Sequence, residues 1–181
     1  MAWITKPSGQ TQIARRDEPY LTASMREDLS QRIIPRYETR LACSMPALHM
    51  IQHEYGWIPA QAMEEIGAFL SLSAAEILDT ASFYEEYWLK PKGQHLIAVC
   101  RSIACEFCGQ KEVTQACKDK LGIEVGETTD DGKFTLVEVE CLGSCGTAPA
   151  MLVDEKLHED VKPSQIAQIL DQAARSHGHG H

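Results

Sequence analysis

Long apolar runs are absent from this 181-residue sequence. None approaches the roughly eighteen residues that a membrane-spanning helix needs, so we expect a globular chain without membrane insertion. Basic residues are also scarce: 17 Lys and Arg stand against 26 Asp and Glu, which gives a formal net charge of −9. Such a charge repels polyphosphate backbones, and the basic residues are scattered, so nucleic acid is a poor partner.

The signatures of several enzyme classes are missing as well. The sequence contains no glycine loop for phosphate, no dinucleotide fingerprint and no nucleophile paired with a base. We therefore predict that the chain has no NADH site of its own. The N-terminal segment lacks the apolar core of a secretory signal, and we interpret residues 1–20 as a flexible arm.

Hydrophobic periodicity divides most of the chain into two units. Residues 21–88 show helical apolar spacing in four segments, and capping-box patterns at Ser24 and Ser73 begin two of them. This pattern predicts an N-terminal four-helix bundle. A polar, turn-rich stretch then precedes residues 93–174, where strand and helix patterns alternate. The second unit is therefore predicted to be a small α/β domain, and the whole chain falls in the α+β class.

The cysteines are the most informative residues. Their number is odd, and six of the seven lie in the second half of the chain. This distribution argues against a secreted disulfide framework and favours a reducing compartment, where clustered thiolates are available to metals. The seven are Cys43, Cys100, Cys105, Cys108, Cys117, Cys141 and Cys145.

Two cysteine pairs follow predicted strands. Four residues separate Cys100 from Cys105, and three separate Cys141 from Cys145. Four thiolates suit either tetrahedral zinc or an iron–sulfur cluster. Loops after strands can wrap the wider two-iron cluster, and the glycines flanking Cys145 let backbone N–H groups approach sulfur. The context favours a cluster over zinc.

Cys108 leaves alternative interpretations open. With Cys100 and Cys105 it forms the plant-type ferredoxin spacing C-x4-C-x2-C, which would leave Cys141 or Cys145 without a role. Cys105 and Cys108 also form a C-x-x-C pair, typical of a dithiol oxidoreductase, but that interpretation leaves the other paired cysteines unexplained. A zinc-stabilised interaction module is a further alternative.

The other two cysteines and the histidines are interpreted as structural residues and not as metal ligands. Cys117 falls on an apolar helical stripe and is expected to be a core residue, as is Cys43. His49 and His53 share one side of a predicted helix without a nearby carboxylate, so we interpret them as packing or surface residues. The histidines and glycines of residues 175–181 are interpreted as a disordered tail.

Six motifs then occur in a characteristic order along the chain. They are PALH (46–49), EYGWIP (54–59), ASFY (81–84), Cys100 to Cys105, TTDDGKF (128–134) and ECLGSCGTAP (140–149). From about Pro35 to about Leu170 the sequence resembles the thioredoxin-like [2Fe-2S] subunit of NADH:quinone oxidoreductase, the 24 kDa subunit of respiratory complex I.

The resemblance implies a helical bundle followed by a thioredoxin-like domain. It also implies that Cys100, Cys105, Cys141 and Cys145 are the ligands of one [2Fe-2S] cluster, and it implies no ligand role for Cys108. No side chain of this chain is expected to be catalytic on its own, because the flavin of a partner performs the hydride chemistry.

The implied partner is a flavoprotein subunit that binds NADH and FMN. The chain is then expected to be the electron-transfer subunit of an NADH dehydrogenase complex, cytoplasmic and peripheral to the inner membrane, or in the matrix of a mitochondrion. Similar subunits serve NAD-linked hydrogenases and formate dehydrogenases, so the assembly has alternatives.

Overall fold

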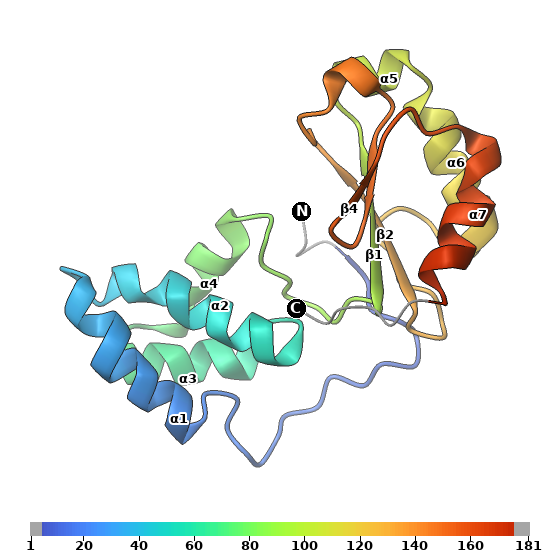
Figure 1. Ribbon diagram of the computed structural model, residues 1–181. Helices are drawn as coiled ribbons and strands as arrows, with labels where there is room; N and C mark the ends of the chain where they lie inside the picture. The colour runs from blue at the N-terminus through green and yellow to red at the C-terminus, as the bar shows by residue number, and fades with distance from the viewer. Residues whose placement is uncertain (1–4, 176–181) are drawn as a thin grey trace. The chain divides into compact units, whose positions relative to one another are not determined.

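The computed structural model describes residues 5–175, which divide into two compact units (Figure 1). The first unit comprises Gln12–Pro91. The second comprises the chain from Lys92 onward, together with the N-terminal stretch up to Thr11. The His- and Gly-rich tail lies outside the described residues, apart from its first position, Arg175.

The first unit is helical. Its elements are α1 (Ala23–Asp28), the π-helical turn η2 (Leu29–Ile33), the 3-10 turns η3 (Ile34–Arg36) and η4 (Leu41–Cys43), α2 (Ser44–Tyr55), α3 (Ala60–Leu70) and α4 (Ala74–Phe83). Leu48, Ile51 and Ile66 are among its fully buried side chains. No single helix within residues 5–175 is long and apolar enough to cross a membrane; α3 and α4 meet that criterion only when joined across a bend of 120°.

Two capping predictions have different outcomes. The box at Ser73 is confirmed: the N–H of Glu76 donates to Ser73 Oγ at 3.2 Å, and the Glu76 carboxylate accepts the N–H of Ser73 at 2.8 Å. The box at Ser24 is wrong. Thr22 has the extended backbone of an N-cap, and its hydroxyl accepts the N–H of Met25 at 3.3 Å, so Ser24 lies inside the first turn of α1.

The second unit contains a four-stranded sheet in the order β2-β1-β3-β4. β1 runs parallel to β2 and antiparallel to β3, and β3 forms an antiparallel pair with β4. α6 and α7 pack against each other beside the sheet (Figure 1). The elements are β1 (His95–Cys100), α5 (Ile103–Phe107), α6 (Gln110–Leu121), β2 (Phe134–Val139), η5 (Cys145–Thr147), β3 (Met151–Val153), β4 (Lys156–His158) and α7 (Pro163–Ala173).

The core of the second unit lies between the sheet and its two long helices. Ile97 and Leu136 from the strands pack with Val113 of α6 and Ile166 of α7. The apolar stripe predicted for α6 is thus buried against the sheet. α6 connects β1 to β2. Because these two strands are parallel, their carboxyl ends lie at the same edge of the sheet.

The N-terminal stretch differs from the flexible arm expected from its composition. The backbone N–H of Lys6 donates to the Gly126 carbonyl at 2.6 Å, and the Ser8 hydroxyl donates to the Asp130 carbonyl at 2.8 Å. The Lys6 ammonium also pairs with the Glu127 carboxylate at 3.1 Å. Polar and backbone hydrogen bonds, which leave no hydrophobic periodicity in the sequence, hold residues 5–11 on the second unit.

Replacing Ser73 with alanine is expected to lower the free energy of unfolding by about 1 kcal/mol, because the N–H of Glu76 at the start of α4 loses the hydroxyl that accepts it. Urea unfolding followed by tryptophan fluorescence suits this test, since Trp57 and Trp88 lie in the first unit. The hydrogen bonds from Ser73 lower the pKa of Glu76 below its ordinary 4.5. The ionised Glu76 carboxylate therefore contributes to the free energy of unfolding above about pH 4.5, and this contribution is lost as the pH falls through the lowered pKa.

Ser24→Ala is the matched control, because Ser24 does not cap a helix. It should change the unfolding free energy by less than about 0.5 kcal/mol. Equal losses in the two variants would contradict the assignment of the cap.

Candidate functional site

The four cysteines predicted as ligands lie at one end of the second unit. Cys100 is the last residue of β1, and Cys105 follows in α5. Cys141 comes shortly after the end of β2, and Cys145 begins η5. The register pairs Cys100 with Val139, so both parallel strands deliver their cysteines to the same edge. In Figure 1, α5 and the orange turn η5 lie together there.

The four thiols differ in burial. Cys100 and Cys105 are 2% and 1% exposed and form a small apolar cluster with Ala150. Cys141 and Cys145 are exposed. The pKa of the Cys105 thiol is raised, first by burial and further by the neighbouring thiols of Cys100 and Cys145. One pair is thus anchored in the protein, and the other reaches the surface.

The exposed pair has opposite pKa shifts. The pKa of Cys141 is lowered, first by the N–H of Gly143, which donates to Cys141 Sγ at 3.3 Å. Gly143 has φ +74°, a left-handed conformation that favours glycine. The pKa of Cys145 is raised, first by the charge of Cys141. Two thiolates side by side repel each other, and bound iron would relieve that repulsion.

Electrostatic interactions link all four thiols into one group. The Cys100 thiol raises the pKa of Cys105 and lowers the pKa of Cys141, and the Cys141 thiol raises the pKa of Cys145. All seven cysteines of the chain are free thiols. The donors therefore fit an iron–sulfur cluster, which is held by cysteine thiolates. Within residues 5–175, no three His, Cys, Asp or Glu side chains converge in the manner of ligands to a single metal ion.

The remaining cysteines have different surroundings. Cys108 is exposed at the end of α5, where its backbone N–H donates to the carbonyls of Ala104 and Cys105, each at 3.1 Å. Cys117 is fully buried in the core of the second unit, and burial raises its pKa to about 12. Cys43 is buried in the first unit. The core interpretations of Cys117 and Cys43 are confirmed.

The two helical histidines are confirmed as surface residues. His49 and His53 are both exposed on α2. The ring of His49 packs at 4.9 Å from the ring of Tyr87, which is a packing contact between side chains of the first unit.

Three polar residues next to the cysteines were not identified from the sequence. Ser144 and Thr147 flank Cys145, and both hydroxyls contact the carboxylate of Glu159. The hydroxyl pair in the SCGT segment is a weak local signal for such an acceptor. Glu159 has no local signal, because only the fold brings the residue after β4 beside this turn.

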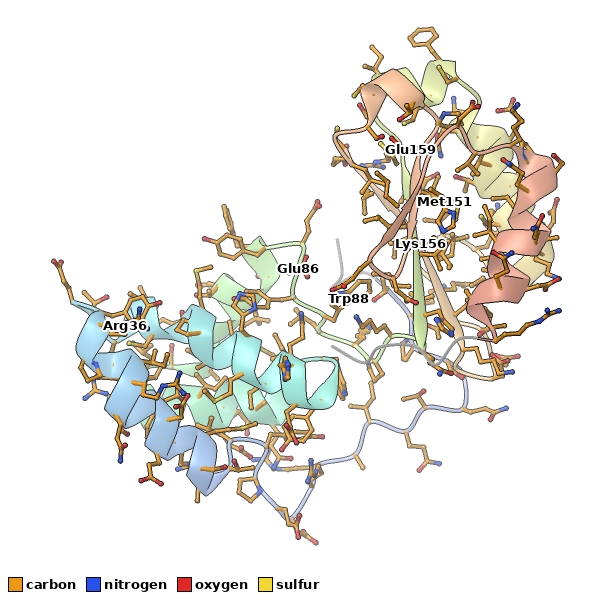
Figure 2. All side chains as sticks on the ribbon, viewed as in Figure 1. Arg36, Glu86, Trp88, Met151, Lys156 and Glu159 are labelled. Atoms are coloured by element: carbon orange, nitrogen blue, oxygen red, sulfur yellow. The ribbon has the colours of Figure 1, made fainter. Side chains whose placement is uncertain are left out.

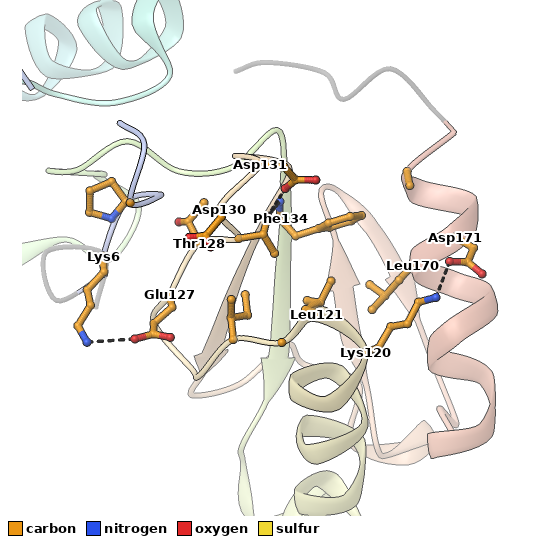
Figure 3. Close-up of a pocket in the computed structure, with 16 residues that line it drawn as sticks. Lys6, Lys120, Leu121, Glu127, Thr128, Asp130, Asp131, Phe134, Leu170 and Asp171 are labelled. Carbon is orange, nitrogen blue, oxygen red and sulfur yellow. Dashed lines mark hydrogen bonds and ion pairs between the residues drawn. The ribbon is translucent and has the colours of Figure 1, made fainter. Parts of the chain in front are cut away.

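A cavity of about 670 Å³ lies elsewhere in the second unit (Figure 3). Its lining includes Phe134, the first residue of β2, whereas the cysteines follow the other end of that strand. Lysines and acids around it form ion pairs, among them Lys120 with Asp171 at 2.8 Å. We assign no ligand to this cavity.

Comparison with known proteins extends these observations. The family described as thioredoxin-like [2Fe-2S] ferredoxin matches residues 30–174. A subunit of the NADH-quinone oxidoreductase of Pseudomonas aeruginosa is 36% identical over 162 residues, which cover 90% of this chain and 97% of that protein. The subunit of the same name from Escherichia coli K12 is 35% identical over 151 residues, which cover 83% of this chain and 90% of that protein.

A solved structure shares the fold. The NAD+-reducing [NiFe]-hydrogenase in its H2-reduced state superposes with a TM-score of 0.65 at 23% identity. The match covers 77% of this chain and 24% of that hydrogenase chain, so this chain spans about a quarter of its length. At this identity the likeness concerns the fold alone.

Alkylation should separate the three cysteines outside the group. In the native protein at pH 8, Cys108 is expected to react with iodoacetamide, because it is exposed. Cys117 and Cys43 should react only in denaturant, since both are buried and the Cys117 pKa of about 12 leaves almost no thiolate. Peptide mass mapping measures each site. Native-state labelling of Cys117 at the rate of Cys108 would contradict the described packing.

Proposed function

Because the chain belongs to the thioredoxin-like [2Fe-2S] ferredoxin family, we propose that its four grouped cysteines hold one [2Fe-2S] cluster and make it an electron-transfer subunit of an NADH-oxidising complex. The proposed ligands are Cys100, Cys105, Cys141 and Cys145. The observation that carries this ligand set is that the parallel strands β1 and β2 bring these cysteines to one edge of the sheet, where the thiols shift one another's pKa values.

The chain's own residues would have two tasks at this site. The cluster, when bound, supplies one-electron exchange. The buried thiols of Cys100 and Cys105 anchor one side in an apolar environment. The exposed loop with Cys141 and Cys145 offers a short route to a partner, and the Gly143 N–H stabilises charge on Cys141.

We propose that the partner is a flavoprotein subunit that binds NADH and FMN. The two bacterial relatives, both named as subunits of NADH-quinone oxidoreductase, are 36% and 35% identical to this chain, and the matches cover 97% and 90% of their lengths. This chain lacks a dinucleotide fingerprint, so NADH oxidation is assigned to the partner. The assembly would place the chain in the cytoplasm, peripheral to the inner membrane, or in the mitochondrial matrix of a eukaryote.

A second assembly is an NAD-linked hydrogenase or formate dehydrogenase. The hydrogenase likeness supports only the fold, at 23% identity. The identities and coverage of the two bacterial relatives therefore make the NADH:quinone oxidoreductase the preferred assignment.

The proposed organisation follows the two units. Residues 21–88 would form a four-helix bundle, and residues 93–174 would form the thioredoxin-like domain that carries the cluster. The helices α1 to α4 and the mixed sheet with its flanking helices support these boundaries.

Iron and sulfide analysis of the full-length chain tests the ligand set. Protein purified anaerobically should contain about two iron and two sulfide per chain. Cys105→Ala should lose most of both, because one iron loses a thiolate. Cys108→Ala is the matched control and should retain the wild-type content.

Two results would overturn the assignment. One zinc per chain without sulfide would favour the zinc-stabilised module. Loss of iron in Cys108→Ala with retention in a Cys145→Ala variant would favour the plant-type ligand set.

A further inference from the structure

The turn that carries Cys145 is held from the side by a residue of another segment. Ser144 Oγ and Thr147 Oγ1 each donate to the same oxygen of Glu159, Oε1, at 2.5 Å. Figure 2 shows Glu159 beside this end of the second unit. These two hydroxyls stand immediately before and two residues after Cys145, so a single carboxylate brackets the cysteine.

The donor count shows why the charge of Glu159 matters. Each hydroxyl carries one hydrogen, and the oxygens of Ser144 and Thr147 lie only 2.7 Å apart. When both hydrogens point to Glu159, neither hydroxyl donates to the other, and only a strong acceptor favours that arrangement. The two hydroxyls lower the pKa of Glu159, so the carboxylate is charged at neutral pH.

Backbone hydrogen bonds continue the same connection. The N–H of Asp160 donates to the Thr147 carbonyl at 2.8 Å, and the N–H of Val161 donates to the Pro149 carbonyl at 3.0 Å. The segment after β4 therefore lies alongside residues 147–149, which follow Cys145. The Glu159 side chain adds hydrogen bonds to Ser144 and Thr147, on either side of the cysteine.

We propose that Glu159 is a positioning residue for the cluster. Through Ser144 and Thr147 it fixes the turn that presents the Cys145 thiolate, and its negative charge favours the oxidised over the reduced cluster. The inference rests on the proposed function, because it assumes that Cys145 binds iron. It assigns a role to a residue that is distant in sequence from every cysteine of the group.

The charge effect is tested by Glu159→Gln. This variant retains an oxygen that can accept from the hydroxyls and removes the charge. A redox titration of the full-length protein, followed by visible absorbance, should give a reduction potential higher than that of the wild type. Glu155→Gln is the matched control: it makes the same charge change at the far end of the β3–β4 hairpin and should shift the potential less.

The positional effect is tested by a Ser144→Ala, Thr147→Val double variant. It keeps the Glu159 charge and removes both donors. Cluster loss in the presence of a chelator should become about tenfold faster, because two charge-assisted hydrogen bonds are lost, and the potential should move less than in Glu159→Gln. In the metal-free protein, amide hydrogen exchange across 144–147 should also become faster.

The outcomes separate this inference from the proposed function. A wild-type chain that assembles no [2Fe-2S] cluster would overturn both. If the wild type assembles the cluster, and Glu159→Gln has the same potential as Glu155→Gln, the charge effect is refuted. The positional effect is tested separately. If the double variant loses its cluster no faster than the wild type, and its amides at 144–147 exchange no faster than those of the wild type, Glu159 is not a positioning residue.

Discussion

The parallel pairing of β1 with β2 is the constraint on which the site depends. It places Cys100 opposite Val139, so the loops that leave both strands begin at one edge of the sheet. α6 makes the parallel connection, and its buried stripe, which includes Val113 and Cys117, anchors it to the sheet. The core on one side of the sheet and the cysteine group at its edge are therefore parts of one arrangement.

The group combines an inner and an outer pair of thiols. Cys100 and Cys105 lie in an apolar cluster, whereas Cys141 and Cys145 lie on exposed loops whose geometry depends on hydrogen bonds. The Gly143 N–H supports Cys141, and the Glu159 carboxylate holds the turn of Cys145. Burial and hydrogen bonding are two of the means by which a protein adjusts a cluster's potential, and here they act on different pairs.

Features with a local signal could be predicted from the sequence. The alternation of strands and helices after residue 93, the capping box at Ser73 and the core position of Cys117 follow from periodicity or short-range hydrogen bonding. Features that depend on distant partners could not. β4 is only three residues long, and Glu159 gains its role because the hairpin returns the chain to the Cys145 turn. The ligand set itself came from the resemblance, since spacing alone left Cys108 as a rival.

The central claim is that this chain holds a two-iron cluster on the grouped thiols. Low-temperature EPR of the dithionite-reduced protein, purified anaerobically at full length, tests it most directly. The account predicts a rhombic signal from one reduced [2Fe-2S] cluster per chain. An EPR-silent sample that contains stoichiometric zinc would contradict it.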